Sequence, residues 1–191
     1  MNRTSAEIAT RRYSLVQRLI HWIVAALVLT AIAAGMTLGT LGFEGARDRF
    51  GLDVTNALYT YHKTFGVLIL VLMLARVVLR VVAGKPEYFR SLEPWQRLLS
   101  NTVHALLYVL LLVMPVLGWL ATAAGDFPVE FFGLHLPGLI GVDQALSEQL
   151  FFWHATVGWA IAALVCLHIA GAVYHWRVRR DGVMQRMSLF P

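Results

Sequence analysis

Residues 150–173 read LFFWHATVGWAIAALVCLHIAGAV, an apolar stretch that contains His154 and His168. As an α-helix it is about 36 Å long, enough to cross a hydrocarbon core of about 30 Å. The two histidines are fourteen residues apart, so they share one helix face and are separated by about 21 Å along the axis. Ionisable side chains within a membrane span are costly and usually functional. The stretch therefore predicts a membrane-spanning helix with a functional group at each of two depths.

Three further apolar runs of similar length precede this stretch: Leu19–Leu38, Phe65–Ala83 and Val103–Ala124. The 191-residue chain is 58% hydrophobic and 14% charged, whereas soluble domains are about 25% charged. The runs also lack the regular polar face of soluble amphipathic helices. The first run exceeds the apolar core of a signal peptide, about 7–15 residues, so we expect it to be retained. We predict an all-α integral membrane protein, a four-transmembrane-helix bundle.

The charges in the connecting segments predict the orientation of this bundle. The side of the bundle with the N-terminal arm, the connector 76–97 and the C-terminal tail holds thirteen basic and four acidic residues, a net +9, whereas the other side holds three and seven, a net −4. The positive-inside rule then places both termini in the cytoplasm. We expect a cytoplasmic arm at 1–12, a transmembrane domain at 13–176 and a basic cytoplasmic tail at 177–191. The overall charge reflects this topology and does not indicate nucleic-acid binding.

The connections on the outer side are the least regular parts of the sequence. Residues 39–56, rich in glycine and charge, are expected to form a loop, followed by a helix from about Ala57 to Val82. Pro115 should kink the third helix. The second outer loop, 125–147, contains an apolar segment at 131–137, which we interpret as an interfacial piece packed over the outer mouth of the bundle.

Four of the seven histidines form two pairs according to their depth in the predicted helices. His62 and His154 lie at the outer ends of their helices, and His21 and His168 lie toward the cytoplasmic ends. Haem accepts one axial imidazole on each face, whereas zinc needs three or four ligands at one centre. We therefore expect two haem groups, each held between two helices. Because both axial positions of each iron would be filled, the haems should carry single electrons and should not bind dioxygen.

A steric argument distinguishes these four histidines from the others. A porphyrin lies flat against the helix that ligates it, so the residue one turn later should be small. For the four paired histidines these residues are Ala25, Gly66, Gly158 and Ala172. The same position holds Tyr108 after His104 and Arg179 after His175, so we do not expect these two histidines to be axial ligands. Small residues also favour close packing of membrane helices in general.

Several charged or titratable side chains lie close to the predicted haems. Arg76 and Arg80 follow His62 at the cytoplasmic end of the second helix and are expected to pair with haem propionates, a quinone head group or lipid phosphates. Lys63 is positioned to hold a propionate or to attract an anion. His104 and His175 lie near the cytoplasmic boundary and are candidates for a quinone site. His175 in particular is a candidate proton donor, because imidazole titrates near neutral pH.

Together these motifs resemble the bacterial cytochrome b561 family, over nearly all of residues 13–191. The resemblance rests on Arg12-Tyr13-Ser14, Arg18–Trp22, His62–Gly66 leading to Arg76, His104 with Tyr108, Pro115–Gly118 and the last helix from Trp153 to His175. It implies a multi-pass protein of the bacterial inner membrane with two b haems. It also implies the axial pairs His21 with His168 and His62 with His154, the same pairs that the depth argument indicates.

The family resemblance implies more than one activity. The branch most like this chain is similar to superoxide oxidase, an oxidoreductase that passes electrons from periplasmic superoxide to ubiquinone. Other members are quinone-linked cytochrome b subunits that serve a hydrogenase, a dehydrogenase or a periplasmic redox protein. The net charge of −4 on the outer side disfavours capture of the superoxide anion and suits a basic partner such as a c-type cytochrome. A third possibility is a membrane module without redox activity, in which the histidines only link helices.

Overall fold

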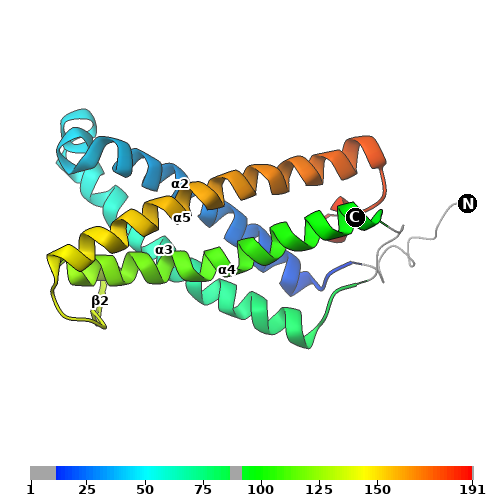
Figure 1. The fold of residues 1–191 in the computed structure, drawn as a ribbon, viewed down its shortest axis with the longest axis horizontal. Helices are drawn as coiled ribbons and strands as arrows, with labels where there is room; N and C mark the ends of the chain where they lie inside the picture. Colours follow the sequence, from blue (N-terminus) through cyan, green and yellow to red (C-terminus); the bar gives the residue numbers. More distant parts are fainter. Residues whose placement is uncertain (1–11, 87–91, 191) are drawn as a thin grey trace, which may run out of the picture.

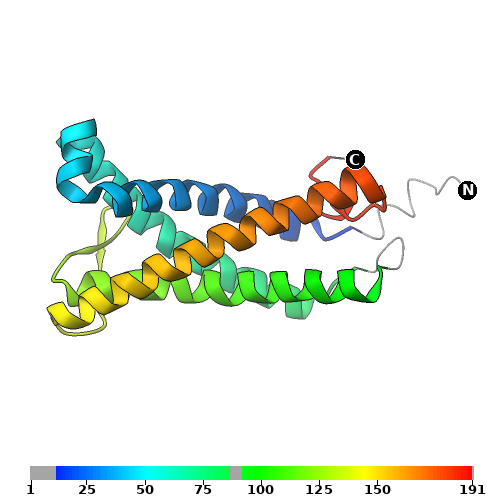
Figure 2. The same ribbon diagram turned by 45° about the horizontal axis from the view of Figure 1, so that its top comes forward.

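The computed structural model describes residues 12–86 and 92–190. Within them, four long helices form an up-and-down bundle (Figures 1 and 2). They are α2 (Leu15–Phe50), α3 (Leu52–Val82), α4 (Pro94–Ala124) and α5 (Gln144–Tyr174). All four are long and apolar enough to cross a membrane, as the sequence predicts. Except for Arg12, the predicted N-terminal arm lies outside the described residues.

The alternating helix directions give the bundle two distinct ends (Figure 1). The turn between α2 and α3, a short hairpin and the start of α5 lie at one end, which we call the hairpin end. The start of α2, the end of α3, the start of α4 and the C-terminal segment lie at the other end, which we call the tail end. Side chains at one sequence depth on neighbouring helices can therefore meet at the same level of the bundle.

The helices begin where the sequence supplies N-cap side chains. Ser14 and Gln17 form a reciprocal capping box at α2, and Glu93 and Gln96 form another at α4. Asp143 caps α5 by accepting a hydrogen bond from a backbone N–H in the first turn, at 3.0 Å. Such side chains satisfy backbone N–H groups that have no partner within the helix. The three caps define the level at which each apolar run starts.

The prediction of a loop at 39–56 is wrong. Helix α2 continues to Phe50, and α3 already begins at Leu52. Two glycines make this possible, because Gly42 has φ 66° inside α2 and Gly51 has φ 82° between the two helices. Glycine adopts these left-handed conformations without the steric penalty of a side chain. The chain reverses at these two positions, and the residues around them remain helical.

The predicted interfacial segment at 131–137 is part of a β-hairpin. Strands β1 (Val129–Phe131) and β2 (Leu134–Leu136) pair antiparallel. The two turn residues, Phe132 and Gly133, both have positive φ, 49° and 81°, as a two-residue hairpin turn requires. Strand β1 packs against α3, so this end of the bundle is covered by a defined structure.

The most extensive helix contacts join α4 to α5 and α2 to α3. The buried core consists of Val24, Val28, Ile69, Met73 and Ile161. By their positions along the helices, these residues lie midway between the two predicted histidine levels. Many large apolar side chains on the outside of the bundle are exposed, as expected for helices whose outer faces contact lipid. Helix α4 continues through Pro115.

The C-terminal segment folds back onto the start of the bundle. After α5, a π-helical turn at His175–Arg179 and a 3₁₀ turn at Met184–Arg186 lead the chain toward α2. Arg18 donates a hydrogen bond to the Ser188 carbonyl at 2.7 Å, and Trp22 donates one to the Met187 carbonyl at 2.9 Å. The last residues of the described segment therefore contact the first turns of α2.

Candidate functional site

Two histidines from different helices meet near the hairpin end. The ring centroids of His62 on α3 and His154 on α5 are 6.0 Å apart, with an angle of 79° between the ring planes. His154 donates a hydrogen bond from Nδ1 to the Met114 carbonyl of α4 at 3.1 Å. This bond leaves Nε2 available as a ligand, the usual arrangement for a metal-binding histidine.

The His62 ring has a polar atom without a regular partner. Its Nδ1 is buried and makes no hydrogen bond of normal geometry, although the backbone of Ala31 on α2 interacts with the ring. A buried polar atom in this state costs free energy, so its presence here indicates a role beyond packing. A histidine that binds a metal through one ring nitrogen usually bonds a backbone carbonyl or carboxylate through the other, and the Ala31 backbone is a group that interacts with this ring.

Two glycines on the other two helices allow these rings to be accommodated. A Cβ added to Gly35 of α2 would lie 2.9 Å from Cε1 of His62, and one added to Gly118 of α4 would lie 2.8 Å from Cε1 of His154. Any other residue would therefore displace the imidazoles. Glycine inside a helix costs about 1 kcal/mol relative to alanine, so these positions give up some helix stability for space around the rings.

Three histidines lie together nearer the tail end. The ring centroids of His21 on α2 and His168 on α5 are 6.2 Å apart, with an interplanar angle of 72°. His104 on α4 lies closer to His168, at 5.1 Å and 88°. It donates a hydrogen bond from Nδ1 to the Ser100 carbonyl, one turn earlier in its own helix, at 2.5 Å.

The ring separations can be compared with those expected at a haem. A metal–imidazole bond is about 2.0–2.1 Å, and a ring nitrogen lies about 1.1 Å from the ring centre, so two imidazoles on one iron have centroids about 6.3 Å apart. The separations of 6.0 Å for His62 with His154 and 6.2 Å for His21 with His168 fit this value. The 5.1 Å between His104 and His168 is too short. Across 12–86 and 92–190, no group of three His, Cys, Asp or Glu side chains is placed to hold one metal ion.

The two arginines near the tail end have different surroundings. The Arg76 guanidinium lies 5.7 Å from the ring centre of Tyr108 on α4, and its charge acts on His21, His104 and His168. Arg80, one turn later, donates a hydrogen bond to the Tyr13 hydroxyl at 3.1 Å. Arg76 is therefore the arginine placed to interact with an anionic or polar group beside the three histidines near the tail end.

Lys63, next to His62, is held by the hairpin. Its ammonium group lies 2.6 Å from the Glu130 carboxylate and donates a hydrogen bond to the Pro128 carbonyl at 3.0 Å. The hydrogen bond from Lys63 holds the pKa of the Glu130 carboxyl below its ordinary value, which outweighs the opposing effect of burial. Glu130 is thus ionised at neutral pH, and the pair has no net charge.

His175 also has a defined partner. Its Nδ1 lies 2.6 Å from the Asp181 carboxylate, and the Arg179 Nε lies 3.2 Å from the same oxygen. The Asp181 side chain is 1% exposed. Arg179 in turn donates a hydrogen bond to Gln96 at the start of α4, at 2.9 Å. The ring of His175 is therefore oriented through Nδ1 by a carboxylate that also pairs with Arg179.

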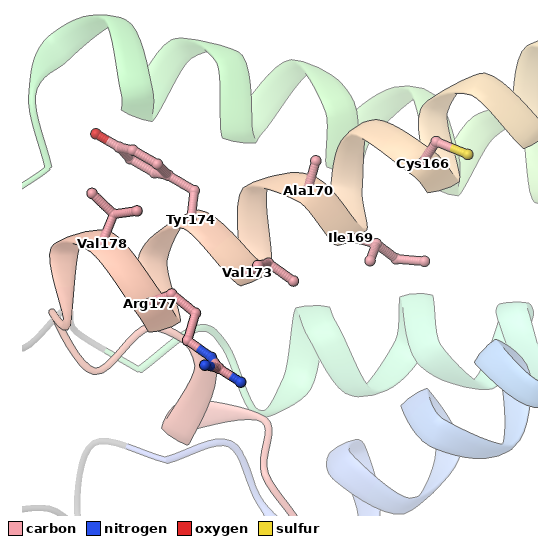
Figure 3. A pocket seen from close by; sticks show the side chains of 7 residues that line it. All are labelled: Cys166, Ile169, Ala170, Val173, Tyr174, Arg177 and Val178. Atoms are coloured by element: carbon pink, nitrogen blue, oxygen red, sulfur yellow. The ribbon is translucent and has the colours of Figure 1, made fainter.

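An apolar groove of about 540 Å³ runs along the outside of α5, but none of the candidate histidines lines it. Figure 3 shows its side chains, Cys166, Ile169, Ala170, Val173, Tyr174, Arg177 and Val178. Cys166, interpreted from the sequence as a small packed thiol, is exposed here. The groove is therefore separate from both histidine levels.

The structure brings the predicted ligands together and shows two ring contacts that the steric argument from the sequence did not anticipate. Gly66, one turn after His62, has open space around it, and the glycines that contact the rings are Gly35 and Gly118. The sequence contains a spacing that indicates both glycine contacts. Gly35 lies fourteen residues after His21, and Gly118 fourteen residues after His104, so each shares a helix face with a histidine at the other level.

Comparisons with known proteins identify the family of the chain. The family profile described as prokaryotic cytochrome b561 matches residues 12–188. Cytochrome b561 homolog 2 of Escherichia coli strain K12 is 27% identical over 180 residues, which cover 92% of this chain and 90% of the relative. The probable superoxide oxidase CybB of Yersinia pestis is 25% identical, with 93% and 96% covered. Cytochrome b562 of Cereibacter sphaeroides is 28% identical, with 92% and 94% covered.

The family match extends over all four long helices and both histidine levels. Membership accounts for the four long apolar helices. It also establishes the general class of activity, electron transport by a transmembrane haem protein. The chain therefore belongs to the prokaryotic cytochrome b561 family, as a multi-pass membrane cytochrome of the b type that carries electrons.

Proposed function

We propose that the chain binds two b haems, one between His62 and His154 and the other between His21 and His168. The observation that carries the proposal is the pair of ring separations, 6.0 Å and 6.2 Å, both near the value for two imidazoles on one iron. His154 and His168 share α5 and are about 21 Å apart along it. When bound, each haem would supply a one-electron carrier between the two helices that hold it.

The hairpin end then faces the periplasm, and the tail end with both termini faces the cytoplasm of a bacterial inner membrane. The excess of basic residues in the segments at the tail end supports this orientation through the positive-inside rule. The stack of two sites provides a path for single electrons between the two faces of the membrane.

Residues at the tail end are suited to bind and protonate a quinone, and ubiquinone is the acceptor that the family resemblance implies. Arg76 places a cation near the inner imidazoles, where it can balance a propionate or polarise a quinone carbonyl. His175, oriented by Asp181, is suited to donate a proton from the cytoplasmic side. His104, beside His168, is a second candidate contact for the head group.

The specific activity that we propose is superoxide:ubiquinone oxidoreductase. Two superoxide anions each lose one electron to become dioxygen, and ubiquinone takes up the two electrons together with two protons to become ubiquinol. The similarity to the probable superoxide oxidase of Yersinia pestis over nearly the whole chain supports this activity. The residues of the tail end would supply the two protons.

One observation favours a second candidate function, a quinone-linked cytochrome b subunit for a hydrogenase, a dehydrogenase or a soluble periplasmic redox protein. Lys63, the cation next to the outer ligand, is neutralised by Glu130, and the charged residues at this end of the bundle sum to −4. An acidic surface would slow the approach of superoxide and favour a basic protein such as a c-type cytochrome.

Spectroscopy of the purified protein tests the first step. We expect a reduced-minus-oxidised spectrum typical of b haem and two haems per chain. A colourless protein would refute the proposal. Mixing the oxidised protein with superoxide in a stopped-flow instrument then distinguishes the two functions. Reduction of the haems near the diffusion limit supports the oxidase. Slow reduction by superoxide, together with rapid exchange with a basic c-type cytochrome, supports the subunit.

A further inference from the structure

The hairpin is attached to α3 on both sides of the outer ligand. Before His62 in the chain, the Thr60 hydroxyl donates a hydrogen bond to the Glu130 carboxylate at 3.4 Å. After it, Lys63 forms the 2.6 Å ion pair with Glu130, and the Thr64 hydroxyl accepts a hydrogen bond from the backbone N–H of the hairpin turn at 3.5 Å. One carboxylate therefore contacts residues on either side of the histidine.

The ion pair at this position is well defined. The side chains of Lys63 and Glu130 are 20% and 23% exposed, so both are largely withdrawn from water. The ammonium group also donates to the Pro128 carbonyl, which holds it against the hairpin. As a result, a small anion that approaches the outer histidines meets a neutral pair and not a free cation.

We propose that Glu130 determines the charge selectivity of the outer electron-transfer site. This inference rests on the proposed function, because it assumes a haem between His62 and His154. By neutralising Lys63, the Glu130 carboxylate lowers the rate at which anionic reactants exchange electrons with the outer haem and raises the rate for cationic ones. Removal of that one negative charge should shift the preference of the site toward anions, of which superoxide is one.

Elementary electrostatics gives the size of the effect. A unit charge about 10 Å from a trivalent reactant in water changes its local concentration about eightfold without screening. Screening reduces this factor to about fivefold at 0.01 M ionic strength and about twofold at 0.1 M. For an anion and a cation whose charges are equal in magnitude, the changes in local concentration are opposite. The ratio of their rates should therefore change about 20-fold at 0.01 M and about fivefold at 0.1 M.

The experiment uses two small one-electron oxidants of opposite charge, ferricyanide and tris(phenanthroline)cobalt(III). The dihaem protein in nanodiscs is reduced with dithionite, freed of excess reductant and mixed with either oxidant in a stopped-flow instrument. Each probe removes one electron from a reduced haem, giving ferrocyanide or cobalt(II). For Glu130→Gln we expect faster oxidation by ferricyanide and slower oxidation by the cobalt complex. Oxidation through the tail-end face contributes the same rate in every variant, so it does not reverse the expected changes in the two oxidation rates.

A matched control removes an acid from another ion pair at the same end of the molecule. Glu44 contacts Arg47 and is 69% exposed, and it lies in the part of α2 that follows Gly42. We expect Glu44→Gln to leave the rate ratio close to that of the unaltered protein. A second variant, Lys63→Gln, should shift the ratio in the opposite direction to Glu130→Gln, because it leaves the carboxylate unneutralised.

The outcomes separate this inference from the proposed function. If both haems are present in Glu130→Gln but its rate ratio changes no more than that of Glu44→Gln, the inference is wrong and the dihaem proposal stands. Equal shifts in the same direction for Glu130→Gln and Lys63→Gln would also overturn it, since a loosened hairpin and not charge would then explain the rates. If the unaltered protein binds no haem, both proposals fail.

Discussion

The glycine at position 118 offers the most direct test of the outer site. Substitution of Gly118 by alanine would place a Cβ 2.8 Å from Cε1 of His154, whereas ordinary contacts lie at 3.4–4 Å. The ring must therefore move by about 0.6 Å. It is not free to do so at no cost, because Nδ1 donates a hydrogen bond to the Met114 carbonyl of the same helix as Gly118.

The expected magnitude follows from this displacement. Overpacking of a well-packed site costs about 1–3 kcal/mol. If overpacking destabilises the orientation in which the imidazole binds haem, the affinity for the outer haem should decrease about 5- to 150-fold, since each 1.4 kcal/mol is a factor of ten. The helix itself should gain up to about 1 kcal/mol, because alanine is a better helix former than glycine. The variant should therefore fold normally and bind less haem.

The assay is the haem content of the purified Gly118→Ala protein, with a redox titration of the haem that remains. The inner pair, His21 with His168, serves as an internal control, because its haem should be retained. Gly39→Ala on α2 is the matched variant, since a Cβ there meets nothing within 4 Å. A Gly118→Ala protein with two haems of unchanged affinity would refute the reasoning, as would equal loss of haem from Gly39→Ala.

Four further outcomes can be measured. His62→Ala or His154→Ala should remove the outer haem and retain the inner one in the haem stoichiometry; loss of both would contradict independent sites. His104→Ala should retain both haems, and loss of one with normal folding would show that our ligand assignment is wrong. Because the pKa of the Glu130 carboxyl is lowered in the folded protein, its stabilising effect is present above its ordinary pKa and is lost as pH falls through the lowered value. Hydrogen-exchange protection of the hairpin should therefore persist from about pH 7 to about pH 5, and loss near pH 6 would contradict this reasoning. Ser147→Ala removes a buried hydrogen bond of 2.9 Å to α4 and should lower the free energy of unfolding by about 1 kcal/mol. Thermal unfolding in detergent measures this loss, and an unchanged unfolding midpoint would contradict it.

The sequence alone was sufficient for the four long helices and for the position of each histidine along them. Apolar runs of the length of a membrane span define the helices, and the fixed rise of an α-helix converts residue numbers into depth. For this reason the pairing of His62 with His154 and of His21 with His168 follows from their positions in the chain. The ligand roles themselves remain predictions until haem binding is measured.

Only the tertiary structure decided how side chains meet around the bundle axis. Helical periodicity specifies a face of one helix, but not which neighbour that face contacts. The contact of Gly118 with His154, the position of His104 beside His168 and the ion pair of Lys63 with Glu130 all depend on that arrangement. The hairpin was missed for a similar reason, since two three-residue strands are stabilised by pairing and by packing on α3 and leave little pattern in the sequence. Depth is a local property of each helix, whereas these contacts arise only when separate helices pack together.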